Sequence, residues 1–319
     1  MQNRVKSAFE PKRPRPEGSP EPTRRQLFKA WWQACRPPFL IVDLIPVGLA
    51  FVLAERDLGY WPWGLCIVVL LGCFFLHTVS NIANDLFDYL CGVDTEDSIG
   101  GTHIIQSGLI SPRQISVAII VLVAATILIG AWLVIHSDQY WLCGPIVFAI
   151  LSAIFYVAPP IRYGCRGLGE VFVGINMGFI MLVGAHAVMA GMFSLVTLAF
   201  ALPVALMVAG ILYFQSLPEI ETDLAAGKRT LANILGKEKA EFVFRLWWPV
   251  VWMLMVNLHF SGLAGWPVYL FVLTVPFYWK TCRLIHNATE WLDLDQHGHL
   301  VRKLYLINGI FLIAGAILV

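Results

Sequence analysis

Charged residues are scarce in this sequence. Lys, Arg, Asp and Glu together make up 13% of its 319 residues, whereas hydrophobic residues make up 58%. Because a soluble globular domain is about 25% charged, this chain cannot cover a surface that faces water. The composition excludes a soluble protein, gives no sign of a nucleic-acid partner, and predicts a protein surrounded by membrane lipid.

Closely spaced metal-ligating side chains are also missing. The seven cysteines include no CxxC pair, and the eight histidines include no HxxxH or HExxH pair on an apolar segment. These absences argue against a disulfide framework and against a structural zinc site. We interpret His77 and His186 as packed core residues, and we expect no covalent catalysis because no Ser–His or Cys–His arrangement is present.

The N-terminal residues lack the apolar core of a secretory signal. Residues 11–22 are rich in proline and charge, so we predict a disordered tail over 1–26 and a transmembrane domain over 27–319. Within 27–36, the adjacent Trp31 and Trp32 lie among basic residues, which predicts a short helix at the level of the lipid headgroups.

Long apolar runs occupy the rest of the chain. A spanning helix needs roughly 20 apolar residues, and the fold class expected is therefore all-α, a polytopic bundle of nine transmembrane helices. The nine segments are 38–55, 62–83, 115–136, 140–158, 168–191, 194–217, 243–261, 265–285 and 302–319.

The distribution of Lys and Arg predicts the orientation. With nine spans and a cytoplasmic N-terminus, every Lys and Arg except Arg56 lies before the first span, in a cytoplasmic loop or at the cytoplasmic end of a span. This asymmetry follows the positive-inside rule. We therefore expect the polar chemistry of the protein to face the cytoplasm.

Two groups of polar residues end predicted helices at that side. Asn81, Asn84, Asp85 and Asp88 close the second helix, and at about 100° per residue they share one face. We expect Gly92 to end that helix, with Asp94, Glu96 and Asp97 in the loop beyond it. The second group places Gln215, Glu219 and Asp223 at intervals of four residues at the end of the sixth helix, followed by Gly227 and Lys228.

Carboxylates at the edge of hydrocarbon are costly unless something neutralises them. Opposed clusters of hard oxygen ligands suit Mg²⁺, which commonly binds through a few carboxylates together with substrate phosphates. The alternative is a solvated face on which the acids pair only with basic loop residues. The recurrence of amide and acid side chains at two inward-running helix ends favours the metal site.

A third segment closes the fourth helix. Pro159 and Pro160 break the helix and leave Arg162 and Arg166 in the cytoplasmic loop near both acidic groups. Guanidinium groups suit the binding of a departing diphosphate. The alternative role of these two arginines is to set membrane topology only.

Taken together, these motifs resemble the UbiA superfamily of intramembrane prenyltransferases, and most resemble the branch that acts on 1,4-dihydroxy-2-naphthoate in menaquinone synthesis. The resemblance runs from Arg36 to about Gly236. It rests on the order and spacing of the segments described above, on those at Gly92–Thr95 and Gln106–Arg113, and on Tyr156–Pro159, Gly167–Glu170 and Asp223–Leu231.

The resemblance implies a nine-helix bundle around a central cavity in the bacterial cytoplasmic membrane. It also implies a reaction, the Mg²⁺-dependent transfer of a polyprenyl group from its diphosphate to an aromatic acceptor. The roles it implies are Mg²⁺ binding by Asn81, Asn84, Asp85, Asp88, Glu219 and Asp223, diphosphate binding by Lys228, Arg162 and Arg166, stabilisation of the allylic cation by Tyr156, and placement of the acceptor by Arg36.

This sequence departs from the family pattern at three positions. Gln215 and Glu219 are each one methylene longer than the usual Asn and Asp, which shifts the second group of metal ligands by about an ångström. His103 stands where relatives often carry Arg, and this affects the recognition of acceptor or diphosphate.

Three other classes of membrane protein fit these residues less well. A CDP-alcohol phosphatidyltransferase would have six helices and a DGxxAR element, and the sequence has neither. A transporter would place its polar residues near the bilayer midplane, where only Asp43 is unexplained, and a non-catalytic quinone-binding scaffold would not release diphosphate. The acceptor stays open among naphthoate, hydroxybenzoate, homogentisate and tetrapyrrole compounds, with naphthoate favoured, and prenyl length and oligomeric state are not encoded in a linear motif.

Overall fold

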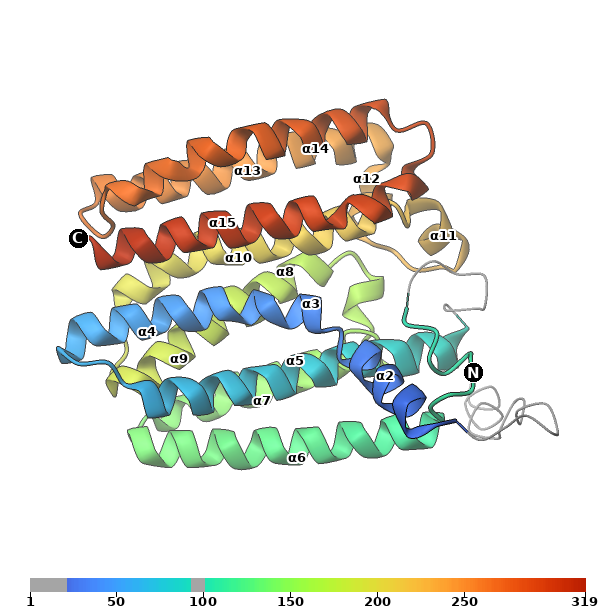
Figure 1. Cartoon of the computed structure of the whole chain (residues 1–319), viewed down its shortest axis with the longest axis horizontal. Coiled ribbons are helices and arrows are strands. Elements are labelled where there is room, and N and C mark those ends of the chain that lie inside the picture. The colour runs from blue at the N-terminus through green and yellow to red at the C-terminus, as the bar shows by residue number, and fades with distance from the viewer. Residues whose placement is uncertain (1–21, 93–100) are drawn as a thin grey trace.

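The computed structural model describes residues 22–92 and 101–319, and the predictions for the remaining residues lie outside it. Its described part consists of helices and loops, with an isolated β-bridge between Arg166 and Arg229. Figure 1 shows the long helices running side by side along the longest axis.

The N-terminal half contains α2 (Arg24–Cys35), α3 (Pro37–Leu40), η1 (Ile41–Asp43), α4 (Leu44–Leu58), α5 (Trp63–Cys91), α6 (Pro112–Ser137), η2 (Tyr140–Leu142), α7 (Cys143–Phe155), η3 (Tyr163–Cys165), α8 (Gly169–Val173), η4 (Gly174–Ile180) and α9 (Met181–Ala190). The C-terminal half contains α10 (Leu195–Ser216), α11 (Ile220–Ala225), α12 (Leu231–Leu235), α13 (Lys237–Phe260), η5 (Trp266–Thr274), α14 (Val275–Asn287), η6 (Trp291–His297) and α15 (Gly298–Ile317).

Eight helical segments of the described chain are long and apolar enough to cross a membrane, and the shorter apolar helix Tyr140–Phe155 lies among them. The predicted all-α membrane fold is confirmed, while the count of nine spans is not. The segment 140–158 is the one that falls short of the length criterion, because Pro159 and Pro160 follow soon after α7 ends at Phe155.

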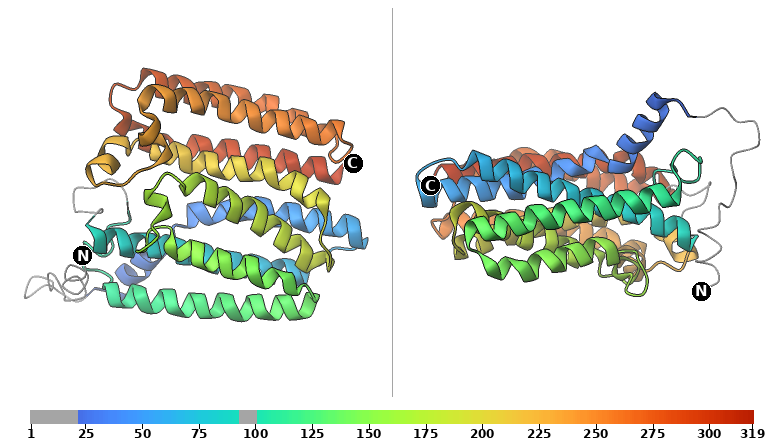
Figure 2. Two further views of the ribbon diagram at one scale, coloured as in Figure 1. Left: turned by 180° about the vertical axis from the view of Figure 1, so that it is seen from behind. Right: turned by 90° about the horizontal axis from the view of Figure 1, so that it is seen from below.

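The predicted headgroup helix forms as α2. A capping box at Thr23 starts it, and Arg36 ends it in the left-handed conformation, at φ 49°. Figure 2 shows α2 turned away from the bundle at the junction with α3. The helix exposes Phe28 and Trp32 and buries Ala30 and Ala34 against the end of α5.

Three hydrophobic clusters hold the bundle together. The largest joins α10, α13 and α15, the second joins α4, α5, α6 and α9, and the third joins α2 to α5 and to the segment around Ile104 and Ile110. The first two cores fix the helices that carry the acidic groups. The third fixes the segments that approach those groups from outside.

Candidate active site

The first acidic group lies at the end of α5, where Gly92 ends the helix as predicted, with φ 72°. Asp85 and Asp88 are 4% and 3% exposed. The Arg36 guanidinium lies 2.5 Å from Asp85 Oδ1, and the Thr102 hydroxyl donates to Asp85 Oδ2 at 2.7 Å. The α2–α3 junction and the segment after residue 100 are therefore both tied to this carboxylate.

Asn81 and Asn84 lie about one turn earlier on α5 and line an internal cavity. The Asn81 side-chain NH₂ donates to the Cys35 carbonyl at 3.2 Å. That bond holds the amide in place and leaves its carbonyl oxygen available as a ligand.

The second acidic group is built differently from the prediction. We expected Gln215, Glu219 and Asp223 on one continuous helix, but α10 ends at Ser216 and α11 begins at Ile220. The reason is Pro218, which has no N–H to donate and whose ring clashes with the preceding turn. Asp223 therefore lies on a separate short helix, where it is 6% exposed.

Lys228 connects the parts of the second group. Its ammonium lies 3.2 Å from Asp223 Oδ1 and 3.9 Å from Glu219 Oε2. Gly227 has φ 73°, a left-handed turn that lets the Lys228 N–H donate to the Asp223 carbonyl at 2.8 Å. The turn thus folds the lysine back over the acids that precede it.

The turn brings carboxylates and a lysine together out of water. Burial raises the pKa of Asp223, against the opposing effect of Lys228. Burial alone would lower the pKa of Lys228, but the carboxylates of Asp223, Glu219 and Asp88 together raise it above its ordinary value. Asp88 belongs to the first acidic group, so Lys228 lies within electrostatic range of both. The buried Lys228 ammonium therefore lies within electrostatic range of three carboxylates, and carboxylate oxygens are ligands that suit a hard divalent cation.

The loop after α7 closes the site on another side. Gly167 N–H donates to the Arg229 carbonyl at 2.7 Å, and Arg229 N–H donates to the Cys165 carbonyl at 3.1 Å. These two bonds pin the loop to the Lys228 turn. Tyr156 consequently lies near Lys228 and Asp88, and burial raises the pKa of its hydroxyl.

The two arginines of this loop occupy different surroundings. Arg162 adopts φ 47° and lies close to Cys91 at the end of α5 and to Cys165. Arg166 is exposed, and its guanidinium donates to the Pro160 carbonyl at 3.2 Å. Neither arginine forms an ion pair with a carboxylate of the described residues, so their diphosphate-binding role stays a prediction.

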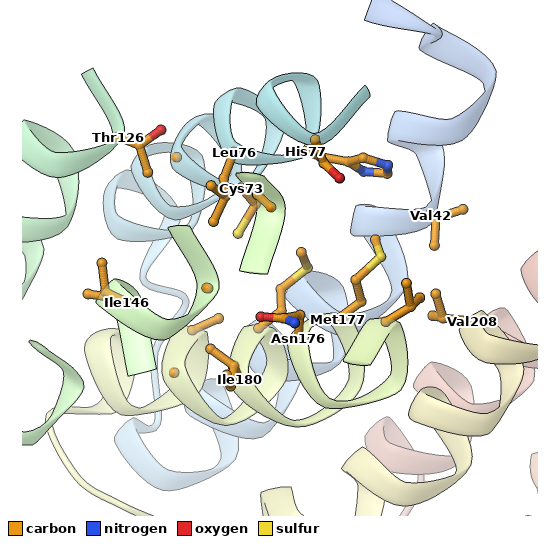
Figure 3. A pocket seen from close by; sticks show the side chains of 18 of the residues that line it. Val42, Cys73, Leu76, His77, Thr126, Ile146, Asn176, Met177, Ile180 and Val208 are labelled. Atoms are coloured by element: carbon orange, nitrogen blue, oxygen red, sulfur yellow. The ribbon is translucent and has the colours of Figure 1, made fainter. Parts of the chain in front are cut away.

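A cavity of about 340 Å³ runs inward from these groups. Arg36, Asn81, Asn84, Tyr156 and Gln215 line its polar end. Figure 3 shows its deeper part, where most of the lining is apolar. The apolar side chains there include Val42, Leu76, Ile146, Met177, Ile180 and Val208. The arrangement can hold a molecule with an anionic head and a hydrocarbon tail.

The donor set fits a hard divalent cation. Asp223 Oδ2 is buried without a hydrogen-bond partner among the described residues, and the neighbouring donors are carboxylate and amide oxygens. Within residues 22–92 and 101–319, no three Asp, Glu, His or Cys side chains converge on a single point. Two protein carboxylates completed by substrate phosphate oxygens would satisfy Mg²⁺ without such a triad.

Sequence reasoning missed several polar residues around the cavity. Thr102 carried no signal, because a single threonine in a loop has no pattern. Asp43, unexplained in the sequence, is fully buried, and its Oδ1 lies 2.9 Å from His77 Nδ1. His77 lines the cavity, and His186 is buried and paired with Asp57 at 2.8 Å.

Comparison with known sequences gives a consistent result. The profile of the UbiA prenyltransferase family matches residues 44–291. A 1,4-dihydroxy-2-naphthoate octaprenyltransferase of Haemophilus influenzae is 31% identical over 278 residues, which cover 84% of this chain and 89% of that protein. The protein of the same name from Bacillus subtilis is 26% identical over 265 residues, covering 82% and 83%.

Comparison with solved structures supports the fold. The structure of a UbiA homolog from Archaeoglobus fulgidus bound to GPP and Mg²⁺ matches with a TM-score of 0.62 at 15% identity, covering 89% of this chain and 99% of that chain. A digeranylgeranylglyceryl phosphate synthase matches with a TM-score of 0.59 at 17% identity, covering 91% and 99%.

Proposed function

Because this chain belongs to the UbiA prenyltransferase family, we propose that it transfers a polyprenyl group from polyprenyl diphosphate to 1,4-dihydroxy-2-naphthoate. The products would be demethylmenaquinol, diphosphate and CO₂. The prenyl-transferring activity follows from the family, and the acceptor is our inference from relatives that bear this name. The single observation that supports the chemistry is the placement of buried carboxylates from both acidic groups within range of Lys228, next to the polar end of a mostly apolar cavity.

Binding of the diphosphate is the first task of these residues. Asn81, Asn84, Asp85, Asp88, Glu219 and Asp223 would hold Mg²⁺. When bound, this ion neutralises the leaving diphosphate and lowers the barrier to its departure. Lys228 lies within electrostatic range of both groups, and its ammonium has three N–H donors, so it could pair with a phosphate oxygen as well as with Asp223.

The reacting carbon must be protected from water once the diphosphate departs. Tyr156 lines the cavity beside Lys228, and its ring face attracts an allylic cation by about 1–2 kcal/mol when both are desolvated. The apolar lining beyond it excludes water. A ring carbon of the acceptor then forms the new C–C bond, the C–O bond to diphosphate breaks, and loss of the carboxylate as CO₂ restores aromaticity.

Arg36 is suited to place the acidic acceptor. It lies at the cavity mouth and contacts Asp85, so its guanidinium could bridge the acceptor carboxylate and the first acidic group. The integral membrane location follows from the apolar helices and the family. We propose in addition that the acidic groups face the cytoplasm of a bacterial cell.

Prenyl transfer by the purified protein in detergent tests the proposal. The protein is incubated with Mg²⁺, a polyprenyl diphosphate and a panel of aromatic acceptors, and the masses of the products are measured by mass spectrometry. Prenylated dihydroxynaphthoate with a mass deficit of CO₂, lost on adding EDTA, is the expected result. Metal-dependent transfer to hydroxybenzoate or homogentisate alone would refute the assignment of naphthoate as the acceptor. Diphosphate release without transfer to any acceptor would refute both the naphthoate assignment and the proposed prenyl transfer.

A further inference from the structure

Two polar side chains in the cavity have no part in the chemistry described above. His77 projects from α5 and Asn176 from η4, and both line the cavity among apolar neighbours. Figure 3 shows them entering from opposite walls, with His77 on the side of Val42. A polyprenyl chain offers no hydrogen bond to either group, whereas a polar ligand could satisfy both.

The tautomer of a neutral His77 is set by its partner. Asp43 is fully buried and lies 2.9 Å from Nδ1 of the imidazole. A carboxylate only accepts hydrogen bonds, so Nδ1 carries the proton, and in the neutral ring Nε2 is an acceptor. Among the described residues, Asp43 is the only hydrogen-bond partner of this imidazole. Nε2 is therefore left for a ligand that donates.

The same reasoning fixes Asn176. Its side-chain nitrogen donates to the Phe172 carbonyl at 2.7 Å, and because a carbonyl only accepts, the amide cannot be rotated by 180° without losing this bond. Its Oδ1 is buried and has no hydrogen-bond partner among the described residues. Oδ1 is thus a second acceptor left without a donor.

The backbone around Asn176 holds this acceptor in place. Residues 174–180 form a π-helix, a form often found at functional sites. Gly178 lets this helix lie directly on α10, since a Cβ at that position would be 2.3 Å from the Ala205 Cβ. The wall that presents Asn176 therefore has little room to move.

The position of the two acceptors relative to the acidic groups suits an aromatic ring. His77 precedes Asn81 by four residues on α5, so it lies on the same face about 6 Å deeper, at 1.5 Å per residue. That separation is about the width of one aromatic ring. Asp85 lies eight residues from His77, so a ring held there would lie about 12 Å deeper along α5 than a diphosphate bound at Asp85.

We propose that His77 Nε2 and Asn176 Oδ1 accept hydrogen bonds from the two hydroxyl groups of an aromatic para-diol, and that Asp43 is a positioning residue for His77. The inference rests on the proposed function and adds to it a selection for the reduced, dihydroxy form of the ring. A quinone presents two carbonyl oxygens, which cannot donate to either residue. The site therefore binds the diol and rejects its oxidised form.

The first test measures acceptor KM in variants. His77→Leu and Asn176→Leu each remove one acceptor at similar volume, and each should raise the KM for dihydroxynaphthoate about tenfold, the equivalent of about 1.4 kcal/mol. The KM for the polyprenyl diphosphate should change far less. His186→Leu is the matched control, because it replaces a buried histidine that is paired with an aspartate, here the exposed Asp57, outside the cavity lining. Unchanged acceptor KM in both cavity variants, with the proteins folded by thermal melting, would overturn the proposal.

The second test removes the donors from the ligand instead. Each monomethyl ether of the acceptor should bind the wild-type enzyme about tenfold more weakly than the diol, a factor that again corresponds to about 1.4 kcal/mol. The ether that lacks the hydroxyl bound by His77 should bind His77→Leu as well as it binds the wild-type enzyme. The other ether should bind Asn176→Leu as well as it binds the wild-type enzyme. Asp43→Asn should reduce the discrimination between diol and ether, which a purely structural role would leave intact. If every combination of enzyme and ether lost the same affinity, the proposed pairing of each hydroxyl group with one residue would be refuted.

These outcomes are separable from failure of the proposed function. If wild-type protein prenylates no acceptor, binding of the diol is still measurable by quenching of tryptophan fluorescence. Binding of the diol that both cavity variants weaken would support the subsite, although the reaction assignment had failed. Absence of diol binding to the wild-type protein would reject the subsite itself.

Discussion

The two acidic groups differ in how the fold holds them. Asp85 and Asp88 lie within the continuous 29-residue helix α5, and Asp85 is held by Arg36 and Thr102, which come from two other segments. Asp223 lies on the six-residue helix α11, after the break at Pro218, and its partner Lys228 comes from the adjacent turn. The first group is therefore fixed by tertiary contacts, and the second by a local backbone turn.

This difference predicts different responses to substitution. In the first group, a change of side chain should alter chemistry while leaving the backbone in place, because a long packed helix does not depend on the contacts of one side chain. In the second group, the backbone itself sets the positions of Glu219 and Asp223. Changes in the turn should therefore act on function through geometry.

The largest effect is expected from Asp85→Asn. The amide keeps the size of the side chain but removes the negative charge that would hold Mg²⁺, so prenyl transfer should fall by about 10³-fold. The measurement is the rate of transfer at saturating Mg²⁺, with thermal melting as the control for folding. A variant that retains more than about one-tenth of the wild-type rate would contradict a metal role for Asp85.

A smaller loss, about 10²-fold, is expected from Lys228→Gln. The variant loses a cation for the diphosphate, so the KM for polyprenyl diphosphate should rise. It also frees Asp223 from its ion pair, so less Mg²⁺ should be needed for half-maximal activity. Separate titrations of Mg²⁺ and of polyprenyl diphosphate measure the Mg²⁺ requirement and the KM. If both requirements rose together, Lys228 would serve only to hold the turn.

Much of this site could be predicted from the sequence because its features are local. The spacing of Asn81, Asp85 and Asp88 on one helix depends only on helical geometry, and Gly92 ended that helix as expected. The polar group around Asp223 was also recognised. The prediction of a continuous helix there was wrong, because Pro218 interrupts the helix between α10 and α11.

The parts that could not be predicted depend on contacts between distant segments. Asp43 meets His77 across 34 positions, and Arg36 meets Asp85 across 49. No linear pattern reports either pairing. Both residues of the first pair looked anomalous in the sequence, one as an acid in an apolar helix and the other as a lone histidine, but only the fold brings them together.

Restoring helical continuity at the second group should have an effect of about tenfold. Pro218→Ala gives back the missing N–H and allows α10 to extend into α11, which would rotate Glu219 and Asp223 away from Lys228. A displacement of about 1 Å at a reacting centre is costly, so transfer should fall although the helix is more regular.

The matched control for this substitution is Pro203→Ala. Pro203 lies inside α10, remote from the acidic residues at its end, and is buried. The same chemical change there should leave the KM for polyprenyl diphosphate near the wild-type value. Similar losses in both variants would show that α10 responds as a whole, and that the break at Pro218 has no special role.

The smallest effect is expected from Glu219→Asp, which shortens the side chain to the length usual in the family. The Glu219 side chain is 28% exposed, and its Oε2 lies 3.9 Å from the Lys228 ammonium, so the carboxylate has room to adjust. Transfer should change by less than about threefold.

The converse change, Asp88→Glu, adds a methylene at a residue that is only 3% exposed. Overpacking there costs about 1–3 kcal/mol, so its activity should fall much further. If the two substitutions had equal effects on the rate of transfer, the two acidic groups would be equally constrained, and the contrast between a group fixed by packing and a group fixed by a turn would be wrong.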